Sequence, residues 1–260
     1  MKLKMLLIPF ICAIISSRLC AEEFETGMML GDDAITVRVL QEPDNISNPI
    51  VYFVPRNGDD TASKAARDTV RKLGGRLVEL IYPNTSFVPF AINNVKYTFN
   101  PGMIFTEQGL RKTLNTSNEG ALGDVQTLAQ MLFEGEEFLA GAKAIVEVRN
   151  NRNKGFGILT HEIGNLHGKN TKSYYANTNW DEDDFLYVNN EEIFYYFMKK
   201  GINVVLQDNN KVQDNGSLAA RCKKSCAGKH VPYIKVEAQT GNIEPQKELL
   251  ESVAEYLEGT

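Results

Sequence analysis

The sequence is poor in the residues that most often hold metal ions or redox centres. Among its 260 residues are three histidines and four cysteines. Two of the cysteines lie in the first 20 residues, so Cys222 and Cys226 form the one pair farther along the chain. A zinc site built from two cysteine pairs is therefore excluded. In an exported protein this pair predicts a small disulfide loop. A metal pair or a redox dithiol is the alternative, and the CxxxC spacing disfavours both.

Long apolar runs are also missing beyond the first 21 residues, so stable membrane insertion is not expected after that point. The start of the chain has Lys2 and Lys4, then the apolar run Met5–Ile15, and it ends in small or polar residues before Ala21. This order predicts a secretory signal peptide over residues 1–21, cleaved after Ala21, and an exported protein that is periplasmic or secreted. An uncleaved anchor is the alternative, but about 11 apolar residues are too few to span a bilayer.

The remaining residues, 22–260, contain no internal repeat, no low-complexity tract and no linker, which favours a single domain. The formal net charge of the whole chain is −5. The predicted signal contributes three basic and no acidic residues, so its removal takes the charge to −8. An acidic surface argues against nucleic acid and against anionic membranes as partners.

Strand and helix patterns alternate along the chain, which predicts an α/β fold with a mixed central sheet flanked by helices. The expected strands are 35–40, 50–54, 76–82, 95–99, 143–148, 202–207 and 232–238, and the main expected helices are 62–73, 118–139, 191–200 and 245–257. Residues 22–34 are expected to be a polar lead-in, and 150–184 an irregular loop. Strand 50–54 runs into the polar turn 56–60, where α/β proteins usually place ligand chemistry.

Several separated segments, in order, resemble a family of secreted hydrolases. They are VPRNGDDTASKAA, KYTFNPGMIFTEQGLRKTL, and DDFLYVNNEEIFYYFMKKGINVVLQDNNKVQDNGSLAARC followed by YIKVEAQTGN. This set resembles the zinc carboxypeptidase superfamily, in the branch of the succinylglutamate desuccinylases and aspartoacylases. The resemblance covers most of residues 50–250 and implies a single carboxypeptidase-like α/β domain.

Enzymes of that family hold one zinc ion with an HxxE turn and a later histidine, and a glutamate near the C-terminus acts as general base. Here the resemblance puts these positions on Arg56, Asp59, Arg149 and Glu237, respectively. A guanidinium group is permanently protonated and has no lone pair for a metal. The expected cofactor is therefore none, because the zinc ligands are replaced and Glu237 alone remains of the set.

Two hypotheses of function follow. In the first, the protein is an inactive relative of zinc peptidases or amidohydrolases. It binds a peptide or small anionic ligand through Arg56, Asp59, Arg149 and Asn150 in the inherited cleft. In the second, it is an active amidase or peptidase acting on peptide or cell-wall amide bonds, with Glu237 as general base. The arginines could also pair with Asp59 and Glu237 in a salt-bridge cluster that preserves the fold.

Two other polar stretches favour simpler explanations. His161 and His167 stand in an HExxxxH pattern, which does not put both rings one helical turn apart, so exposed loop histidines are expected rather than a second metal site. The acidic run 181–184 lacks the alternating oxygen ligands of a calcium loop. A solvated acidic face is therefore expected there.

Overall fold

The structure is a computed structural model that describes residues 21–42, 49–56, 58–83, 86–151, 156–162, 164–165, 167–223, 226 and 231–259. Residues 1–20 of the predicted signal lie outside this part of the chain, so the signal remains a prediction. None of the helices in these ranges is both long enough and apolar enough to cross a membrane.

One mixed sheet of nine strands, as far as the described residues show, runs through the molecule in the order β1-β2-β4-β3-β7-β11-β9-β10-β8. Its centre is parallel: β3 pairs in parallel with both β4 and β7, and β7 pairs in parallel with β11. The strands are β1 (Glu22–Leu30), β2 (Asp33–Gln41), β3 (Ile50–Val54), β4 (Arg76–Ile81), β7 (Ala144–Asn151), β8 (Thr171–Tyr175), β9 (Phe185–Val188), β10 (Val204–Gln207) and β11 (Tyr233–Gln239). The predicted fold class, an α/β fold with a mixed central sheet, is confirmed.

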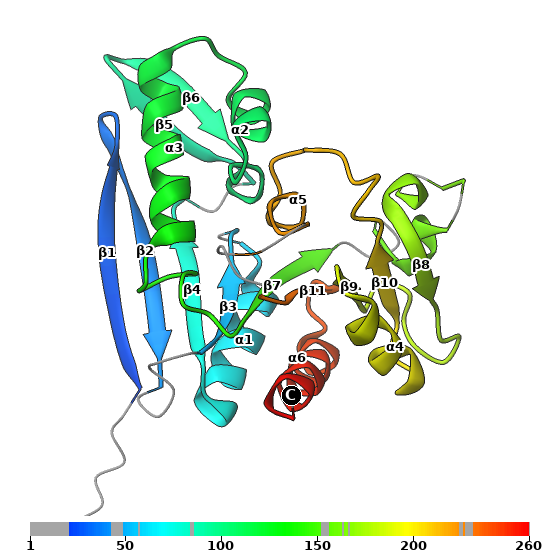
Figure 1. The fold of residues 1–260 in the computed structure, drawn as a ribbon. Helices are drawn as coiled ribbons and strands as arrows, with labels where there is room; N and C mark the ends of the chain where they lie inside the picture. The colour runs from blue at the N-terminus through cyan, green and yellow to red at the C-terminus, as the bar shows by residue number, and fades with distance from the viewer. Residues whose placement is uncertain are drawn as a thin grey trace, which may run out of the picture.

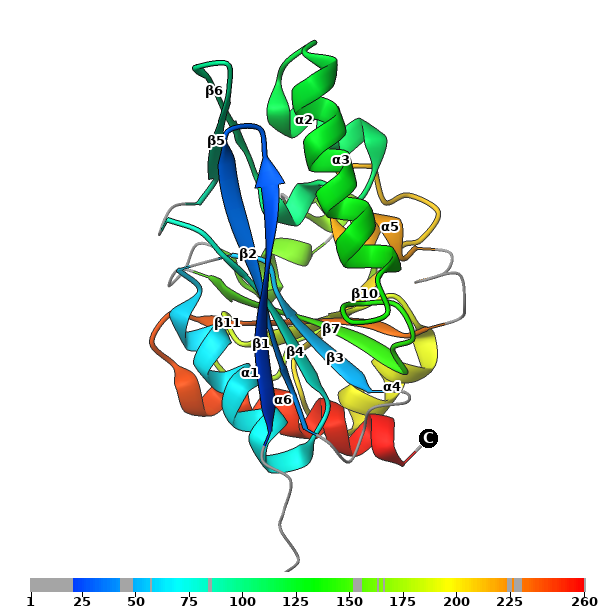
Figure 2. The ribbon, with the colours of Figure 1, turned by 90° about the vertical axis from the view of Figure 1, so that its left-hand side faces the viewer.

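Helices cover both faces of this sheet (Figures 1 and 2). On one face lie α1 (Asp60–Leu73), α4 (Glu191–Lys199) and α6 (Ile243–Glu258), with α1 packed against α6. On the other face lie α2 (Glu107–Leu114), α3 (Glu119–Glu134), α5 (Leu218–Arg221) and the hairpin of β5 (Val88–Ile92) and β6 (Val95–Phe99). Each face has its own apolar core.

The first of these helices shows how the sequence sets the local structure. α1 buries Ala62, Ala65, Ala66 and Val70, which recur at helical spacing and let the helix lie close on the sheet. It ends at Gly74, whose φ of 84° favours glycine. The helix therefore starts immediately after the polar turn that follows β3 and leads back into the parallel neighbour β4.

Three sequence-based expectations about elements are wrong. Residues 22–30 are not a polar lead-in but β1, which forms an antiparallel hairpin with β2. Its side chains are mostly exposed, so they lack the apolar alternation that marks a half-buried strand. The expected loop 150–184 contains β8, whose partner β10 is distant in sequence. The helix expected over 118–139 ends at Glu134, because Gly135 turns the chain.

Candidate functional site

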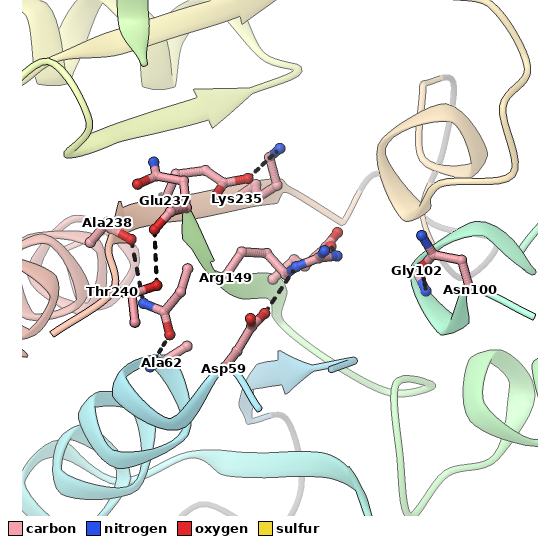
Figure 3. A network of polar contacts seen from close by, with 12 residues as sticks. Asp59, Ala62, Asn100, Gly102, Arg149, Lys235, Glu237, Ala238 and Thr240 are labelled. Carbon is pink, nitrogen blue, oxygen red and sulfur yellow. Dashed lines mark hydrogen bonds and ion pairs between the residues drawn. The ribbon is translucent and has the colours of Figure 1, made fainter. Parts of the chain in front are cut away.

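Three parallel strands, β3, β7 and β11, end at one edge of the sheet, and a cleft of about 770 Å³ opens above them. Arg56 and Asp59 reach it from the turn after β3, Arg149 from β7 and Glu237 from β11. Figure 3 shows Asp59, Arg149 and Glu237 around the same opening. The structure thus brings the sequence-predicted residues into one cleft, as expected for polar groups at the carboxyl ends of neighbouring parallel strands.

The floor of the cleft is a ladder of polar side chains on two adjacent strands. Glu147 and Arg149 alternate along β7, and Tyr233, Lys235 and Glu237 alternate along β11. The two strands are in register, with Lys235 beside Glu147 and Glu237 beside Arg149. Because side chains alternate between the faces of a strand, the residues between them are apolar and pack against the helices on the other face.

Arg149 is the centre of a buried ion network. Its Nη1 donates to Glu147 Oε1 at 3.0 Å, and its Nε lies 3.3 Å from Asp59 Oδ2. The Tyr233 hydroxyl donates to the other oxygen of Glu147 at 2.7 Å. Burial by itself would lower the pKa of Arg149, but the carboxylates of Glu147 and Asp59 raise it above its usual value. The guanidinium is therefore fixed in its charged form, and its charge is already balanced by the carboxylates of Glu147 and Asp59.

A close backbone approach forms the opposite wall at this point. Asn100 begins a short 3-10 turn, Pro101–Met103, and its side chain accepts from the Gly102 N–H. A Cβ atom on Gly102 would come within 2.8 Å of Arg149 Nη1, so a larger residue would displace that guanidinium. The backbone of this turn therefore lies close to the Arg149 guanidinium.

Asp59 is the residue before the first turn of α1, where both arginines of the cleft act on it. Burial raises its pKa, and the positive charges of Arg149 and Arg56 only partly oppose this shift. Its Oδ2 has no aligned hydrogen bond in the described structure, so the contact with Arg149 is an ion pair without a hydrogen bond. The carboxylate thus forms an ion pair with Arg149, while Arg56 acts on it from beyond ion-pair distance.

Arg56 differs from Arg149 in that it forms no ion pair within 4.0 Å with any carboxylate of the described residues, although Asp59 and Glu237 are close enough to influence its pKa. Its buried Nε has no hydrogen-bond partner within the described ranges. Burial lowers its pKa and the positive charge of Arg149 lowers it further, while the negative charges of Asp59 and Glu237 only partly oppose this shift. Arg56 is therefore a desolvated cation at the cleft surface whose donors remain available to an anion.

Glu237 and Asn150 are both committed to other groups. The Glu237 carboxylate pairs with Lys235 Nζ at 2.8 Å, as Figure 3 shows. Asn150 Oδ1 accepts from the Ala62 N–H of α1 at 2.9 Å, and its Nδ2 donates to Gln246 Oε1 at 3.0 Å. Asn150 therefore fixes the start of α1 and joins the cleft wall to α6. Its predicted role in ligand binding stays a prediction.

The far end of the cleft contains the histidine pair, and here the expectation of exposed loop histidines is wrong for His161. Its side chain is 3% exposed and stacks with the rings of Phe156, Phe185 and Tyr187 at 5.3 to 5.6 Å. His167 is partly buried, 4.9 Å from the ring of Phe156. Burial, then Lys235, lowers the pKa of His161 to about 3, so this imidazole is neutral at physiological pH.

The acidic run 181–184 is likewise not a fully solvated face. Asp183 and Asp184 are 1% and 2% exposed. Asp184 accepts from the backbone N–H of Gln239, and burial raises its pKa to about 6. The two residues directly precede β9 (Phe185–Val188) and are buried.

The residues that the family resemblance puts at the metal positions do not fit a zinc ion. Two of those positions hold guanidinium groups, which offer no lone pair, and Asp59 already forms an ion pair with one of them. Elsewhere in the described ranges, no three His, Cys, Asp or Glu side chains gather closely enough to hold a metal ion. Cys222 and Cys226 are buried and joined to each other in a disulfide, as predicted from their spacing.

Sequence reasoning missed Glu147, Lys235, Tyr233 and Gln207, all of which line the cleft. A signal for the first three was present. Each is a polar or aromatic residue at every second position of an otherwise apolar strand, in step with Arg149 or Glu237. Gln207 carried no such signal, because it is a single polar residue at the end of a short strand.

No sequence profile of a known protein family matches the chain, and no curated protein sequence matches it either. Several solved structures share part of its architecture. A leucyl aminopeptidase from Trypanosoma brucei is 13% identical, with a TM-score of 0.44 over 92% of this chain and 54% of the other. A candidate succinylglutamate desuccinylase/aspartoacylase from Shewanella frigidimarina is 11% identical, with a TM-score of 0.38 over 91% and 71%.

A thermostable esterase from Pseudomonas putida is also similar, at 13% identity and a TM-score of 0.27. That match covers 49% of this chain, which spans about a third (34%) of the esterase. All three scores are below 0.5, so the similarities identify neither the family nor the function of this chain. A proposal of function therefore has to rest on the chemistry of the cleft.

Proposed function

We propose that the cleft binds a ligand with a free carboxylate, such as the C-terminal end of a peptide, and that Arg56 is the group that binds it. The observation that carries this proposal is the contrast between the two arginines. Arg149 is neutralised by Glu147 and Asp59, whereas Arg56 is desolvated and forms no ion pair within 4.0 Å with a carboxylate of the described residues. Planar guanidinium donors match the two oxygens of a carboxylate.

The same proposal makes this chain a non-catalytic, metal-free and exported relative of zinc peptidases or amidohydrolases. Arg56 in the turn after β3 and Arg149 on β7 support the loss of metal chemistry, because each supplies positive charge where a dication would need a lone pair. The Lys235–Glu237 ion pair supports the loss of general-base function, because Glu237 is held against a cation rather than against a candidate nucleophile.

The test compares two acetylated tripeptides, one with a free C-terminal carboxylate and one with a C-terminal amide. Binding is measured by titration calorimetry or NMR on residues 22–260, the chain that remains after the predicted signal cleavage. We expect the carboxylate peptide alone to bind, and Arg56→Gln to weaken its binding roughly tenfold to 100-fold, as for a lost charged hydrogen bond. Arg71→Gln, at the exposed far end of α1, is the matched control and should change nothing.

Equal affinity of Arg56→Gln and Arg71→Gln for the carboxylate peptide would overturn the proposal. The competing hypothesis, an active amidase, has its own readout in the same preparation. It requires amide-bond hydrolysis that Glu237→Gln abolishes, together with about one tightly bound zinc by elemental analysis. That result would replace the binding function with the enzymatic one.

A further inference from the structure

At the end of the cleft that holds His161, three buried side-chain acceptors have no hydrogen-bond donor among the described residues. They are His161 Nε2, Asn170 Oδ1 and Gln207 Oε1, which we call the acceptor subsite. A buried unpaired acceptor is costly, so a native protein rarely leaves several together unless water or a ligand completes them.

The acceptor character of Gln207 follows from its other atom. Gln207 Nε2 donates to Asn209 Oδ1 at 2.8 Å and to the Ala219 carbonyl at 3.3 Å. Both of those partners are acceptors, so the amide nitrogen must be on that side and the oxygen on the other. The side chain is 1% exposed and cannot turn freely. Its Oε1 therefore presents a fixed lone pair.

A short hydrogen-bond chain sets the tautomer of His161. The Thr171 hydroxyl donates to the His167 carbonyl at 3.3 Å, so it can only accept from the His161 ring, whose Nδ1 is 3.3 Å away. Nδ1 then carries the proton and Nε2 the lone pair. The depressed pKa of His161 keeps the ring neutral. His161 is thus a second acceptor of fixed direction.

The three acceptors are neighbours. Gln207 is the register partner of Thr171, the residue that contacts His161. Asn170 directly precedes Thr171, and its carbonyl accepts from the N–H of Asp208, the residue after Gln207. The subsite is therefore one compact group at the ends of β8 and β10.

The charge around the subsite selects the kind of donor. Lys235 Nζ lies 5.0 Å from the ring of Phe156 and 5.3 Å from the ring of Tyr187, so a cation already occupies the aromatic wall. The carboxylates that line the cleft, Asp59, Glu147 and Glu237, all belong to the β3, β7 and β11 side. A second cation would meet repulsion without a counter-charge. A neutral group with two N–H donors fits better.

We propose that the acceptor subsite binds a primary carboxamide, such as the side chain of a glutamine or asparagine residue in a peptide. Placing it on the same ligand whose carboxylate meets Arg56 rests on the proposed function. The subsite itself does not. Four strand-to-strand steps separate β3 from β10, which is roughly 19 Å at about 4.8 Å a step. An extended peptide of about five residues would span that distance.

The first experiment uses small probes and the unmodified protein, so it does not depend on a variant folding. The chain has three histidines, so the ring signals are easily separated by NMR. Propionamide should shift the ring signals of His161, and N,N-dimethylpropionamide, which has no N–H donor, should not. Equal shifts from both probes, or none from either, would overturn the subsite and leave ordered water as the partner of these acceptors.

The second experiment uses two acetylated pentapeptides with free C-termini, Gln-Ala-Ala-Ala-Ala and Leu-Ala-Ala-Ala-Ala. We expect the glutamine peptide to bind about tenfold more tightly, and His161→Phe to remove that difference while keeping the ring contacts. His167→Phe is the matched control. The ring of His167 packs on Phe156, but in the described structure it has no buried nitrogen that lacks a hydrogen-bond partner. Equal affinity of the two peptides for the unmodified protein would contradict the proposal.

Arg56→Gln separates the two proposals. If both hold, it weakens both pentapeptides by the same factor and preserves their ratio. If it changes neither affinity while the glutamine peptide still binds more tightly, the carboxylate site fails and the acceptor subsite stands. If it weakens both equally tight peptides, the carboxylate site stands and the acceptor subsite fails.

Discussion

The two faces of β7 and β11 are made by the same strands but carry opposite chemistry. One face holds Val146, Val148, Ile234 and Val236, all fully buried against the helix layer of α1, α4 and α6. The other holds the charged ladder of the cleft. Apolar burial stabilises the fold without direction, whereas buried charges require specific partners. One face can therefore hold the strands in place while the other holds a polar site that is costly to bury.

The largest effect is expected from breaking the charged face at its centre. Arg149→Met leaves Glu147 buried with one partner and Asp59 without its nearest cation. Removing one member of a buried ion pair costs about 3–5 kcal/mol, so the free energy of unfolding in urea should fall by about that amount. Arg38→Met is the control, because Arg38 pairs with Glu25 at the surface and should change stability by less than about 1 kcal/mol. Equal losses would show that the cleft network is no more tightly coupled than a surface pair.

The apolar face should respond to a cavity and leave the cleft working. Ile234→Ala removes a fully buried side chain from the helix-covered core. Such truncations cost about 2–5 kcal/mol, and we expect about 3 kcal/mol by urea unfolding. Affinity for the carboxylate tripeptide should stay within twofold of the unmodified protein. If the variant is still fully folded but binds the tripeptide more than twofold more weakly, the packing of the apolar face and ligand binding in the cleft do not vary independently.

The smallest effect concerns a carboxyl at the boundary of the two faces. The pKa of Asp184 is raised to about 6, so its folding contribution is full below pH 4 and is lost as the pH rises through 6. Asp184→Asn should therefore raise the free energy of unfolding at pH 8 by about 1–2 kcal/mol. A shift of this size corresponds to about 3 kcal/mol, and the amide N–H donors that Asn would bury in place of the carboxyl offset part of this gain. Urea unfolding at pH 4 and pH 8 checks this, and a difference that persists at pH 4 would argue against titration as the cause.

The central part of the fold could be predicted from sequence because its signals are local. The alternation in β2, the apolar run of β3 and the helical spacing of α1 each mark their element, and the two Asn residues at 93 and 94, both with positive φ, mark the β5–β6 hairpin. The edge strands β1 and β8 could not be found in this way. The side chains of β1 are largely exposed and those of β8 mostly half-buried, and pairing with a neighbour decides the structure of both strands.

The position of the candidate site could be predicted from sequence, but which of its charged side chains form ion pairs could not. Polar residues at the ends of β3, β7 and β11 had to meet once the strands were parallel neighbours. Arg149 pairs with Glu147, while Arg56 pairs with no carboxylate of the described residues, and this difference depends on side-chain directions that no sequence pattern shows. The burial of His161 depends in the same way on Phe185 and Tyr187, which come from a distant strand.

The side-chain amide of Asn150 limits motion at the N-terminal end of α1. The first N–H groups of a helix have no carbonyl partner within it, and helix ends therefore tend to fray. In α1 the Ala62 N–H donates to Asn150, whose side chain also donates to the Ala238 carbonyl of β11 and to Gln246 of α6. The helix is pinned where it borders the cleft. A ligand arriving at Arg56 meets a wall that is already ordered, and little conformational entropy is lost in fixing it.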